Sequence, residues 1–412
     1  MRIGGTERRE ILVIGAGPSG AIASALLHRR GRDVLVLERQ KFPRFSIGES
    51  LLVHCLDFVA EAGMIEAVDA AGFQYKNGAA FARGAQYTDF DFGQRFTPGR
   101  PSTYQVQRAT FDKLLADEAA RQGAEIRYEV EIVAVDASSS PVKVTVRDAA
   151  GSAGLVECDF VLDASGFGRT LPRLLELELP SAFPVRHAIF THVADHIPPG
   201  AFDRDKIRVT VHPEAHDVWF WLIPFSGGRS SLGVVARKEF FDGYAGTSAQ
   251  RLQRIVGEDP GLARLLAQAE WDTQARELGG YAANVKSMHG PGFALLGNAA
   301  EFLDPVFSSG VTIAMRSASM AAAVLDRQLG GERVDWEHEF ALPLRRGVDC
   351  FRAYVQAWYD GRFQDCIFFE RQSDDVRRMI CSILAGYAWD EQNPFVAEPE
   401  RRLNVLAQLC AA

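Results

Sequence analysis

The sequence lacks the features of membrane and nucleic-acid-binding proteins. No stretch approaches the roughly 20 uncharged apolar residues that a membrane-spanning helix needs. The net charge of −8 gives no general attraction for nucleic acid or for an anionic membrane. The segment Met1 to Glu10 is polar and charged, without the apolar core of a secretory signal, so we expect a cytoplasmic protein.

Cysteine and histidine are also scarce. The six cysteines include no CxxC pair, a pattern typical of reduced thiols packed in a cytosolic protein. The nine histidines form no HExxH-type motif, and Pro213 argues against His212 and His216 sharing a helix face. We therefore expect neither a disulfide redox centre nor a metal site.

A dinucleotide-binding βαβ unit is present at the N-terminus. The pattern predicts a strand over Ile11–Ile14, a glycine-rich turn, and a helix through Ala21–Leu27 that stops at Gly31. A second strand, Val34–Leu37, ends in the acidic residue Glu38 at the spacing this unit requires.

Each glycine of the turn has a physical task. Gly15 permits the tight turn, Gly17 lets backbone approach a pyrophosphate, and Gly20 lets the helix pack on the strand. The helix N-terminus offers free N–H groups to phosphates, and the acid accepts hydrogen bonds from a ribose. The unit predicts a cofactor-binding set of Gly15, Gly17, Pro18, Ser19, Gly20, Glu38 and Arg39.

The remaining patterns predict a mixed α/β fold. We expect hairpin strands over 78–83 and 87–92, a helix over 111–121, strands over 124–135, 142–146 and 160–164, and an antiparallel sheet over 188–235. After Val311 helical patterning dominates, with Pro343 and Pro394 as breaks.

Five further segments carry a family resemblance. They are FPRFSIGES (42–50), QVQR followed by FD (105–112), LDASG (162–166), WFWLIP (219–224), and GNAAEFLDP followed by SSG (297–310). With the βαβ unit they resemble the flavin-dependent halogenases, a branch of the single-component flavin-hydroxylase superfamily. The resemblance covers roughly residues 10 to 320, and the C-terminal helices are not matched.

The resemblance implies FAD, working as FADH2, and further cofactor contacts. Asn298 stands where many members carry aspartate, and its amide can still bind a ribityl hydroxyl. Ser309 and Gly310 open a helix whose N–H groups would hold a chloride or bromide. The implied contacts are Arg44, Gly48, Glu49, Ser50, Arg108, Asp163, Asn298, Asp304, Pro305, Gly310 and Val311.

The implied fold is α/β, with a Rossmann-like FAD-binding core of glutathione-reductase type. We expect this core to be interleaved, over 1–72, 105–185 and 285–325. An antiparallel-sheet substrate layer would occupy 73–104 and 186–284, and a helical C-terminal region 326–412.

Two tryptophans favour halogenation over hydroxylation. Trp219, Trp221 and Ile223 fall on one face of a strand, because strand side chains alternate with period two. Two indoles there would keep an aromatic substrate away from the flavin while a hypohalous acid passes through a tunnel. A core strand with buried aromatics is the alternative interpretation of the same pattern.

Lys76 matches the lysine that the resemblance assigns to capture of hypohalous acid. It stands in GFQYKNG (72–78), between the FPRFSIGES segment and the first strand of the substrate layer. An ammonium would hydrogen-bond the oxidant, and a neutral amine would form a haloamine; burial favours the neutral form. A solvated turn lysine is the alternative, and Lys41 is the nearest competitor.

The predicted reaction halogenates an electron-rich aromatic of phenol or pyrrole type, free or tethered to an acyl carrier protein, in secondary-metabolite or pigment biosynthesis. The sequence has no second GxGxxG unit, so we expect a separate NAD(P)H:flavin reductase. The C-terminal aromatics between Phe351 and Phe369 either roof the substrate pocket or form a helix core. A two-component FAD-dependent aromatic monooxygenase and a non-catalytic flavoprotein are the competing hypotheses, and the oligomeric state stays open.

Overall fold

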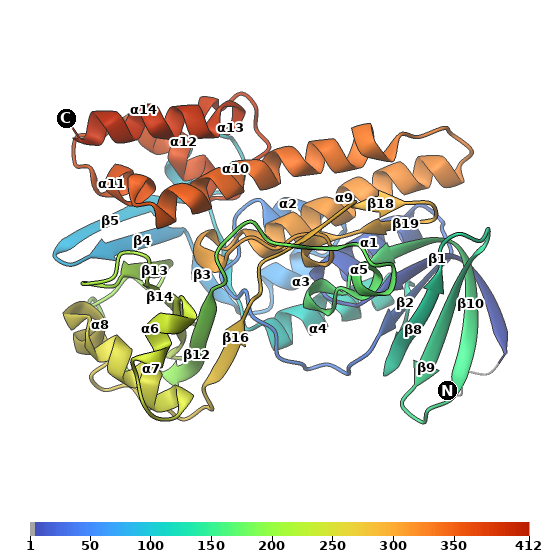
Figure 1. The fold of residues 1–412 in the computed structure, drawn as a ribbon, viewed down its shortest axis with the longest axis horizontal. Coiled ribbons are helices and arrows are strands. Elements are labelled where there is room, and N and C mark those ends of the chain that lie inside the picture. The colour runs from blue at the N-terminus through green and yellow to red at the C-terminus, as the bar shows by residue number, and fades with distance from the viewer. Residues whose placement is uncertain (1–4, 412) are drawn as a thin grey trace.

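The computed structural model describes residues 5–411. Two large sheets lie side by side, and a group of C-terminal helices packs along one side of both (Figure 1). None of the helices in the described range is long and apolar enough to cross a membrane. The predicted α/β class, with a Rossmann-like core and a helical C-terminal region, is confirmed.

The first sheet contains the predicted βαβ unit. Its strand order is β18-β19-β10-β1-β2-β7, and β1 pairs in parallel with both β2 and β10. A hairpin of β8 and β9 adds to β10, while α1, α4 and α9 pack together beside the sheet. The strands are β1 (Thr6–Ile14), β2 (Val34–Glu38), β7 (Glu125–Tyr128), β8 (Val130–Asp136), β9 (Val142–Asp148), β10 (Ala153–Asp163), β18 (His289–Gly290) and β19 (Phe293–Leu295), and the helices are α1 (Pro18–Arg29), α4 (Arg108–Arg121) and α9 (Ser309–Leu329).

The second sheet has the order β16-β12-β15-β14-β13-β4-β5. It is antiparallel as predicted for 188–235, and the added pair β13–β4 is parallel. The strands are β4 (Gly78–Arg83), β5 (Gln86–Asp91), β12 (His187–Ala194), β13 (Lys206–Val211), β14 (Trp219–Phe225), β15 (Arg229–Ala236) and β16 (Arg276–Gly279).

Strand β14 separates two hydrophobic cores. Phe220 and Leu222 pack toward the helices α6 (Lys238–Asp242), α7 (Ser248–Gly257) and α8 (Pro260–Leu265). Trp219, Trp221 and Ile223 belong to the main core, on the side of the first sheet. The alternation predicted for this strand is therefore confirmed, and it aims both indoles toward the space between the sheets.

Two boundaries predicted from the sequence are wrong. The strand expected over 124–135 is two strands, β7 and β8, because Glu129 adopts a left-handed conformation (φ 61°) and turns the chain from one pairing to another. Pro343 does not break the helix: a π-helical turn over Glu337–Ala341 runs into α10 (Leu342–Tyr359). The wider turn changes the hydrogen-bond pattern ahead of the proline, which cannot donate one.

The remaining elements complete the two layers and the C-terminal group. Pro394 begins a short helix, as expected of a break. The elements are α2 (Cys55–Glu61), α3 (Ile65–Asp69), β3 (Gln74–Lys76), β6 (Thr103–Gln105), α5 (Thr170–Leu174), β11 (Glu178–Pro180), β17 (Ala283–Val285), α11 (Arg362–Phe368), α12 (Asp374–Leu384), α13 (Pro394–Ala397) and α14 (Pro399–Ala411).

The glycine turn gives a first test of the fold. A Cβ added at Gly20 would lie 1.9 Å from the carbonyl oxygen of Gly15, so Gly20→Ala must displace the turn from the helix. We expect it to lower the unfolding free energy by about 3 kcal/mol and to weaken FAD binding. Gly257→Ala, whose Cβ meets nothing within 4 Å, is the control for thermal denaturation and flavin titration. Equal stability of the two variants would contradict the packing role of Gly20.

Candidate active site

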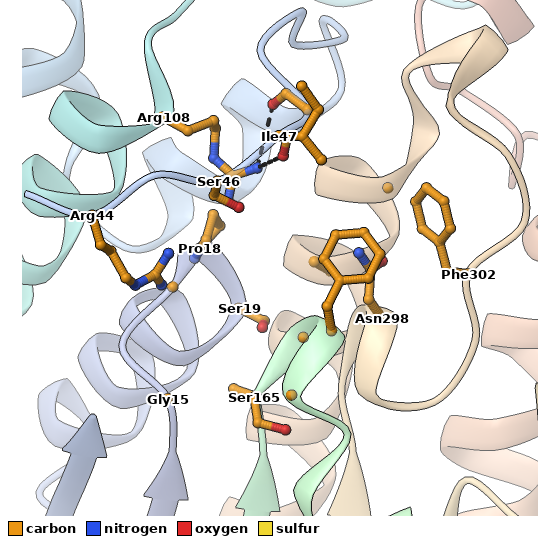
Figure 2. A pocket seen from close by; sticks show the side chains of 18 of the residues that line it. Gly15, Pro18, Ser19, Arg44, Ser46, Ile47, Arg108, Ser165, Asn298 and Phe302 are labelled. Atoms are coloured by element: carbon orange, nitrogen blue, oxygen red, sulfur yellow. Dashed lines mark hydrogen bonds between the residues drawn. The ribbon is translucent and has the colours of Figure 1, made fainter. Parts of the chain in front are cut away.

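A cleft of about 850 Å³ lies between the two sheets. Ile14 and Leu37 line it from the first sheet, and Phe190, Trp219 and Trp221 from the second. Figure 2 shows the glycine turn and residues 44–47 on one side of this cleft, with Asn298 and Phe302 on the other. Its volume suits a ligand of cofactor size.

The turn is built as the sequence predicts. Gly15 has φ 96°, a conformation that disfavours any side chain, and its N–H donates to the carbonyl of Leu37. Glu38 accepts hydrogen bonds from the N–H groups of Ala16 (3.0 Å) and Gln40 (3.0 Å), which fixes its carboxylate at the mouth of the turn. The N-terminus of α1 opens into the cleft here.

A strap segment, defined as residues 42–50, crosses the cleft and is held from behind by Arg108. Asp112 is fully buried and receives two hydrogen bonds from the guanidinium, at 2.6 and 3.0 Å. The same guanidinium donates to the carbonyl of Ile47 at 2.6 Å (Figure 2). Arg44, within the strap, also pairs with Asp112, at 3.3 Å. Arg108 thus lines the cleft with its donors committed to Asp112 and to the strap.

The opposite wall comes from the end of β19 and the start of α9. Asn298 lines the cleft, and its Oδ1 is buried without a partner among the described residues. Asp163 lies behind the wall, where it accepts from the N–H groups of Ser165 (2.9 Å) and Leu171 (2.6 Å). Helix α9 begins at Ser309, as expected, and no side chain caps it. Its first N–H groups are left to a ligand or to water.

The two indoles form one wall of the cleft. Their ring centroids are 6.0 Å apart, and Trp221 donates its Nε1–H to Ser231 at 3.0 Å. Gly233 lies opposite Trp221 on β15, where a Cβ would come within 2.3 Å of the indole ring. The indole therefore occupies the space that a side chain at position 233 would fill.

Trp219 is held by a chain of hydrogen bonds that reaches the C-terminal helices. Its Nε1–H donates to the hydroxyl of Tyr359 at 2.9 Å, and that hydroxyl donates to Asp304 at 2.8 Å. Asp304 also accepts from the N–H of Val306 at 3.0 Å. Burial raises the pKa of Asp304 to about 6, although both hydrogen bonds favour its ionised form.

Lys76 lies behind the cleft wall and is 1% exposed. Its Nζ donates to the hydroxyl of Ser50 (2.7 Å) and to the carbonyl of Leu51 (2.8 Å), and lies 5.2 Å from the ring centroid of Phe92. Burial lowers its pKa to about 7, because the desolvated ammonium loses its hydration. Ser50 itself lines the cleft, so one hydrogen bond connects the amine to the cleft wall. The alternative interpretation of a solvated turn lysine does not describe this side chain.

The structure brings most of the predicted residues together. Those that line the cleft are Gly15, Gly17, Pro18, Ser19, Glu38, Arg39, Arg44, Gly48, Glu49, Ser50, Arg108, Trp219, Trp221, Asn298, Pro305, Gly310 and Val311. Five others stand behind it: Gly20, Lys76, Asp163, Asp304 and Ser309. Sequence reasoning missed the cleft residues Phe190, Arg276, Val130 and Ile132, which stand in strands without a recognisable motif.

The C-terminal aromatics pack mainly as a core. Tyr354, Trp358 and Phe363 are fully buried and contact Phe307 edge to face. Only Tyr359, through Trp219, reaches the cleft wall. In residues 5–411, no group of three His, Cys, Asp or Glu side chains is arranged to hold a metal ion.

The cleft fits a flavin dinucleotide. The glycine turn and the N-terminus of α1 provide N–H groups for a pyrophosphate, and Glu38 provides an acceptor for a ribose. The unpartnered amide oxygen of Asn298 is free to accept from a ribityl hydroxyl.

Comparison with known proteins gives the family. The model of an FAD binding domain matches residues 8–347. A 1H-pyrrole-2-carbonyl-[peptidyl-carrier protein] chlorinase of Pseudomonas fluorescens is 30% identical over 343 residues, covering 76% of this chain and 74% of its own. The chain belongs to the flavin-dependent halogenases. FAD is the cofactor of this family, and a halide is its co-substrate.

Two further proteins are similar to this chain. A tryptophan 2-halogenase of Chondromyces crocatus is 30% identical over 364 residues. The match covers 85% of this chain but only 66% of the length of that protein. A crystal structure described as a flavoprotein/dehydrogenase from Cytophaga hutchinsonii is 42% identical, with a TM-score of 0.95 and coverage of 98% of this chain and 99% of that one.

Tyr359 gives a test of the indole wall. Tyr359→Phe removes the acceptor of Trp219 and leaves a buried N–H unsatisfied, so we expect a loss of about 2 kcal/mol in unfolding free energy. Tyr354→Phe is the matched control, since its buried hydroxyl has no partner among the described residues. Urea denaturation of both flavin-free variants measures the difference. If the two variants were equally stable, the hydrogen bond would not hold the wall.

Proposed function

We propose that this protein is an FAD-dependent halogenase in which hypohalous acid formed in the cleft is passed by Lys76 to an electron-rich aromatic. The observation that carries the proposal is the position of the amine. Lys76 is buried and lies one hydrogen bond behind the wall of a cleft that two indoles also line. Such an arrangement separates the place where an oxidant forms from the place where it is used.

The chain's own residues would hold the cofactor as the site geometry suggests. The turn Gly15–Gly20 and Glu38 would bind the adenosine and pyrophosphate half, while Gly48, Asn298, Pro305 and Val311 would surround the ring system. Bound FAD, once reduced, supplies the two electrons with which oxygen is activated. The N–H groups at the start of α9, from Ser309 and Gly310, would hold the halide.

Lys76 is suited to either form of the relay. With a pKa near 7, the buried amine exists both as an ammonium and as a neutral amine at physiological pH. The ammonium donates a hydrogen bond that makes the halogen more electrophilic, and the neutral amine takes the halogen directly. Ser50 accepts a hydrogen bond from Nζ and thereby fixes the amine toward the wall of the cleft.

The indole wall favours this function over the aromatic monooxygenase. A monooxygenase needs its organic substrate against the flavin, where the oxygen is transferred. Trp219 and Trp221 line the second-sheet side of the cleft, and both indole N–H groups are engaged in hydrogen bonds. Their hydrogen bonds oppose the movement that would admit an aromatic ring.

The substrate and partners are proposed from the relatives and from the sequence. The Pseudomonas relative is named for a pyrrole carried by a peptidyl-carrier protein, which supports a phenol or pyrrole substrate, tethered or free. A separate NAD(P)H:flavin reductase would supply reduced FAD in the cytoplasm. We further propose that the two sheets mark the predicted FAD-binding and substrate layers, divided near residues 72, 104, 185 and 285.

Removing the Lys76 amine tests the relay. Lys76→Met keeps most of the side-chain volume, and we expect halogenated product to fall at least a hundredfold while the reduced flavin still reoxidises. Lys41→Met is the control, because Lys41 is 68% exposed and forms a surface pair with Glu129. Products are measured with a flavin reductase, NADH, chloride or bromide, and a phenol or pyrrole acceptor. Halide-independent oxygenated product would instead support the monooxygenase.

The buried amine also predicts a pH-dependent stability. In the folded protein the pKa of Lys76 is about 7, below the 10.5 of an exposed lysine. Between these two pH values the unfolded chain therefore binds more protons than the folded protein. The free-energy cost of burying Lys76 decreases, and the unfolding free energy increases, as the pH rises. Relative to Lys76→Met, wild type should gain about 2 kcal/mol between pH 7 and pH 9 in denaturant titrations. A difference independent of pH would mean that the lysine is not buried.

A further inference from the structure

A buried carboxyl group of the strap lines the cleft. Glu49 is 1% exposed, and its Oε1 accepts a hydrogen bond from Nε2 of His192 at 2.8 Å. Its other oxygen, Oε2, is buried without a partner among the described residues. A buried carboxylate with one oxygen unsatisfied is costly unless a ligand or a proton uses that oxygen.

His192 connects Glu49 to solvent. It lies on β12 two residues after Phe190, which lines the cleft, so both side chains share one face of the strand. The imidazole is 21% exposed and sits between the rings of Phe225 (5.1 Å) and Phe45 (6.4 Å). The pair therefore spans from the cleft wall to the surface.

The reaction of the proposed function consumes one proton in the cleft. Dihydroflavin, O2, halide and one proton give oxidised flavin, hypohalous acid and water. Oxygen takes two electrons from the flavin and two from the halide; the O–O bond breaks, and an oxygen–halogen bond forms. The proton must enter a cleft walled by indoles, from the solvent outside.

We propose that Glu49 and His192 form the route by which this proton enters the cleft. Oε2 of a protonated Glu49 gives its proton to the reacting oxygen. Solvent then protonates the outer nitrogen of His192, and Nε2 passes its proton to Oε1. Each turnover releases one proton into the cleft and takes one from water. The carboxyl group of Glu49 and the imidazole of His192 then rotate, which returns the proton to the cleft side and the N–H to the side of Glu49.

A negative charge on Glu49 would oppose the binding of a halide in the cleft. An ionised carboxylate in the cleft wall repels a nearby anion, and a buried site screens this repulsion poorly. The charged groups around the pair are Arg108 from α4, Lys76 from β3, Arg229 from β15, Arg276 from β16, and Asp272 from the loop before it. Asp272 is already paired with Arg229 at 2.8 Å, so it does not replace Glu49 as the partner of the imidazole.

The first measurement needs no turnover. In histidine-labelled protein, the NMR resonances of the His192 imidazole, assigned with His192→Ala, report whether this ring contacts Glu49. Glu49→Gln should shift these resonances, because it replaces the carboxylate that accepts the hydrogen bond from Nε2. His196, which pairs with the exposed Glu270, should not move in the same spectrum. Unchanged His192 resonances would overturn the pair.

The second measurement separates proton transfer from a merely structural role. FAD-loaded enzyme is reduced, mixed with oxygen and bromide, and its hypohalous acid is trapped with a small β-diketone. Glu49→Gln and His192→Ala should slow its formation at least tenfold at pH 8, with a rate that rises tenfold per unit of falling pH. Added imidazole should restore His192→Ala. A slow variant with neither the pH slope nor the rescue would overturn the proposal.

The outcomes distinguish this inference from the function on which it rests. If wild type forms no hypohalous acid, the halogenase function fails. If wild type forms it, Lys76→Met loses the product, and both variants of the pair match a His196→Ala control, only the proton route fails.

Discussion

A buried ion pair holds the strap segment, and the positions of Glu49, Ser50 and, through Ser50, Lys76 depend on it. Arg108 grips Asp112 with two donors and the backbone of the strap with a third. From that fixed backbone, Gly48 faces the cleft, Glu49 reaches His192, and Ser50 reaches Lys76. A buried pair of this kind adds little net stability compared with apolar packing, but it fixes geometry, since removing either partner strands a charge. Here the ion pair fixes the positions of three consecutive residues, Gly48, Glu49 and Ser50.

The C-terminal helices act on the cleft without lining it. Tyr359, at the end of α10, carries the hydroxyl that joins Trp219 to Asp304, and Arg186 stacks on its ring at 3.4 Å from the centroid. Tyr354, Trp358 and Phe363 pack around Phe307, which lies in the segment 297–310. The helices therefore brace the wall and the segment 297–310 from behind, a role for which family motifs give no signal.

Local rules explain what could be predicted from the sequence. The glycine turn, the acid after β2 and the alternation of β14 each follow from spacing along one element, and each has its expected geometry. The π-turn before Pro343, the bend at Glu129 and the partnership of Glu49 with His192 depend on contacts between distant segments. The burial of Lys76 is of the second kind, because only the neighbouring Phe92 and Ser50 show that the amine is desolvated.

The fit of Trp221 against Gly233 has a consequence for related sequences. Because a Cβ at position 233 would overlap the ring, the bulk at one position limits the bulk at the other across the β14–β15 pair. In related sequences, a smaller residue at position 221 should therefore accompany a larger residue at position 233. Replacing the indole by a smaller side chain would also widen the cleft. A co-varying glycine would then mark, within one superfamily, the branch point between enzymes that bar a ring from the flavin and those that admit one.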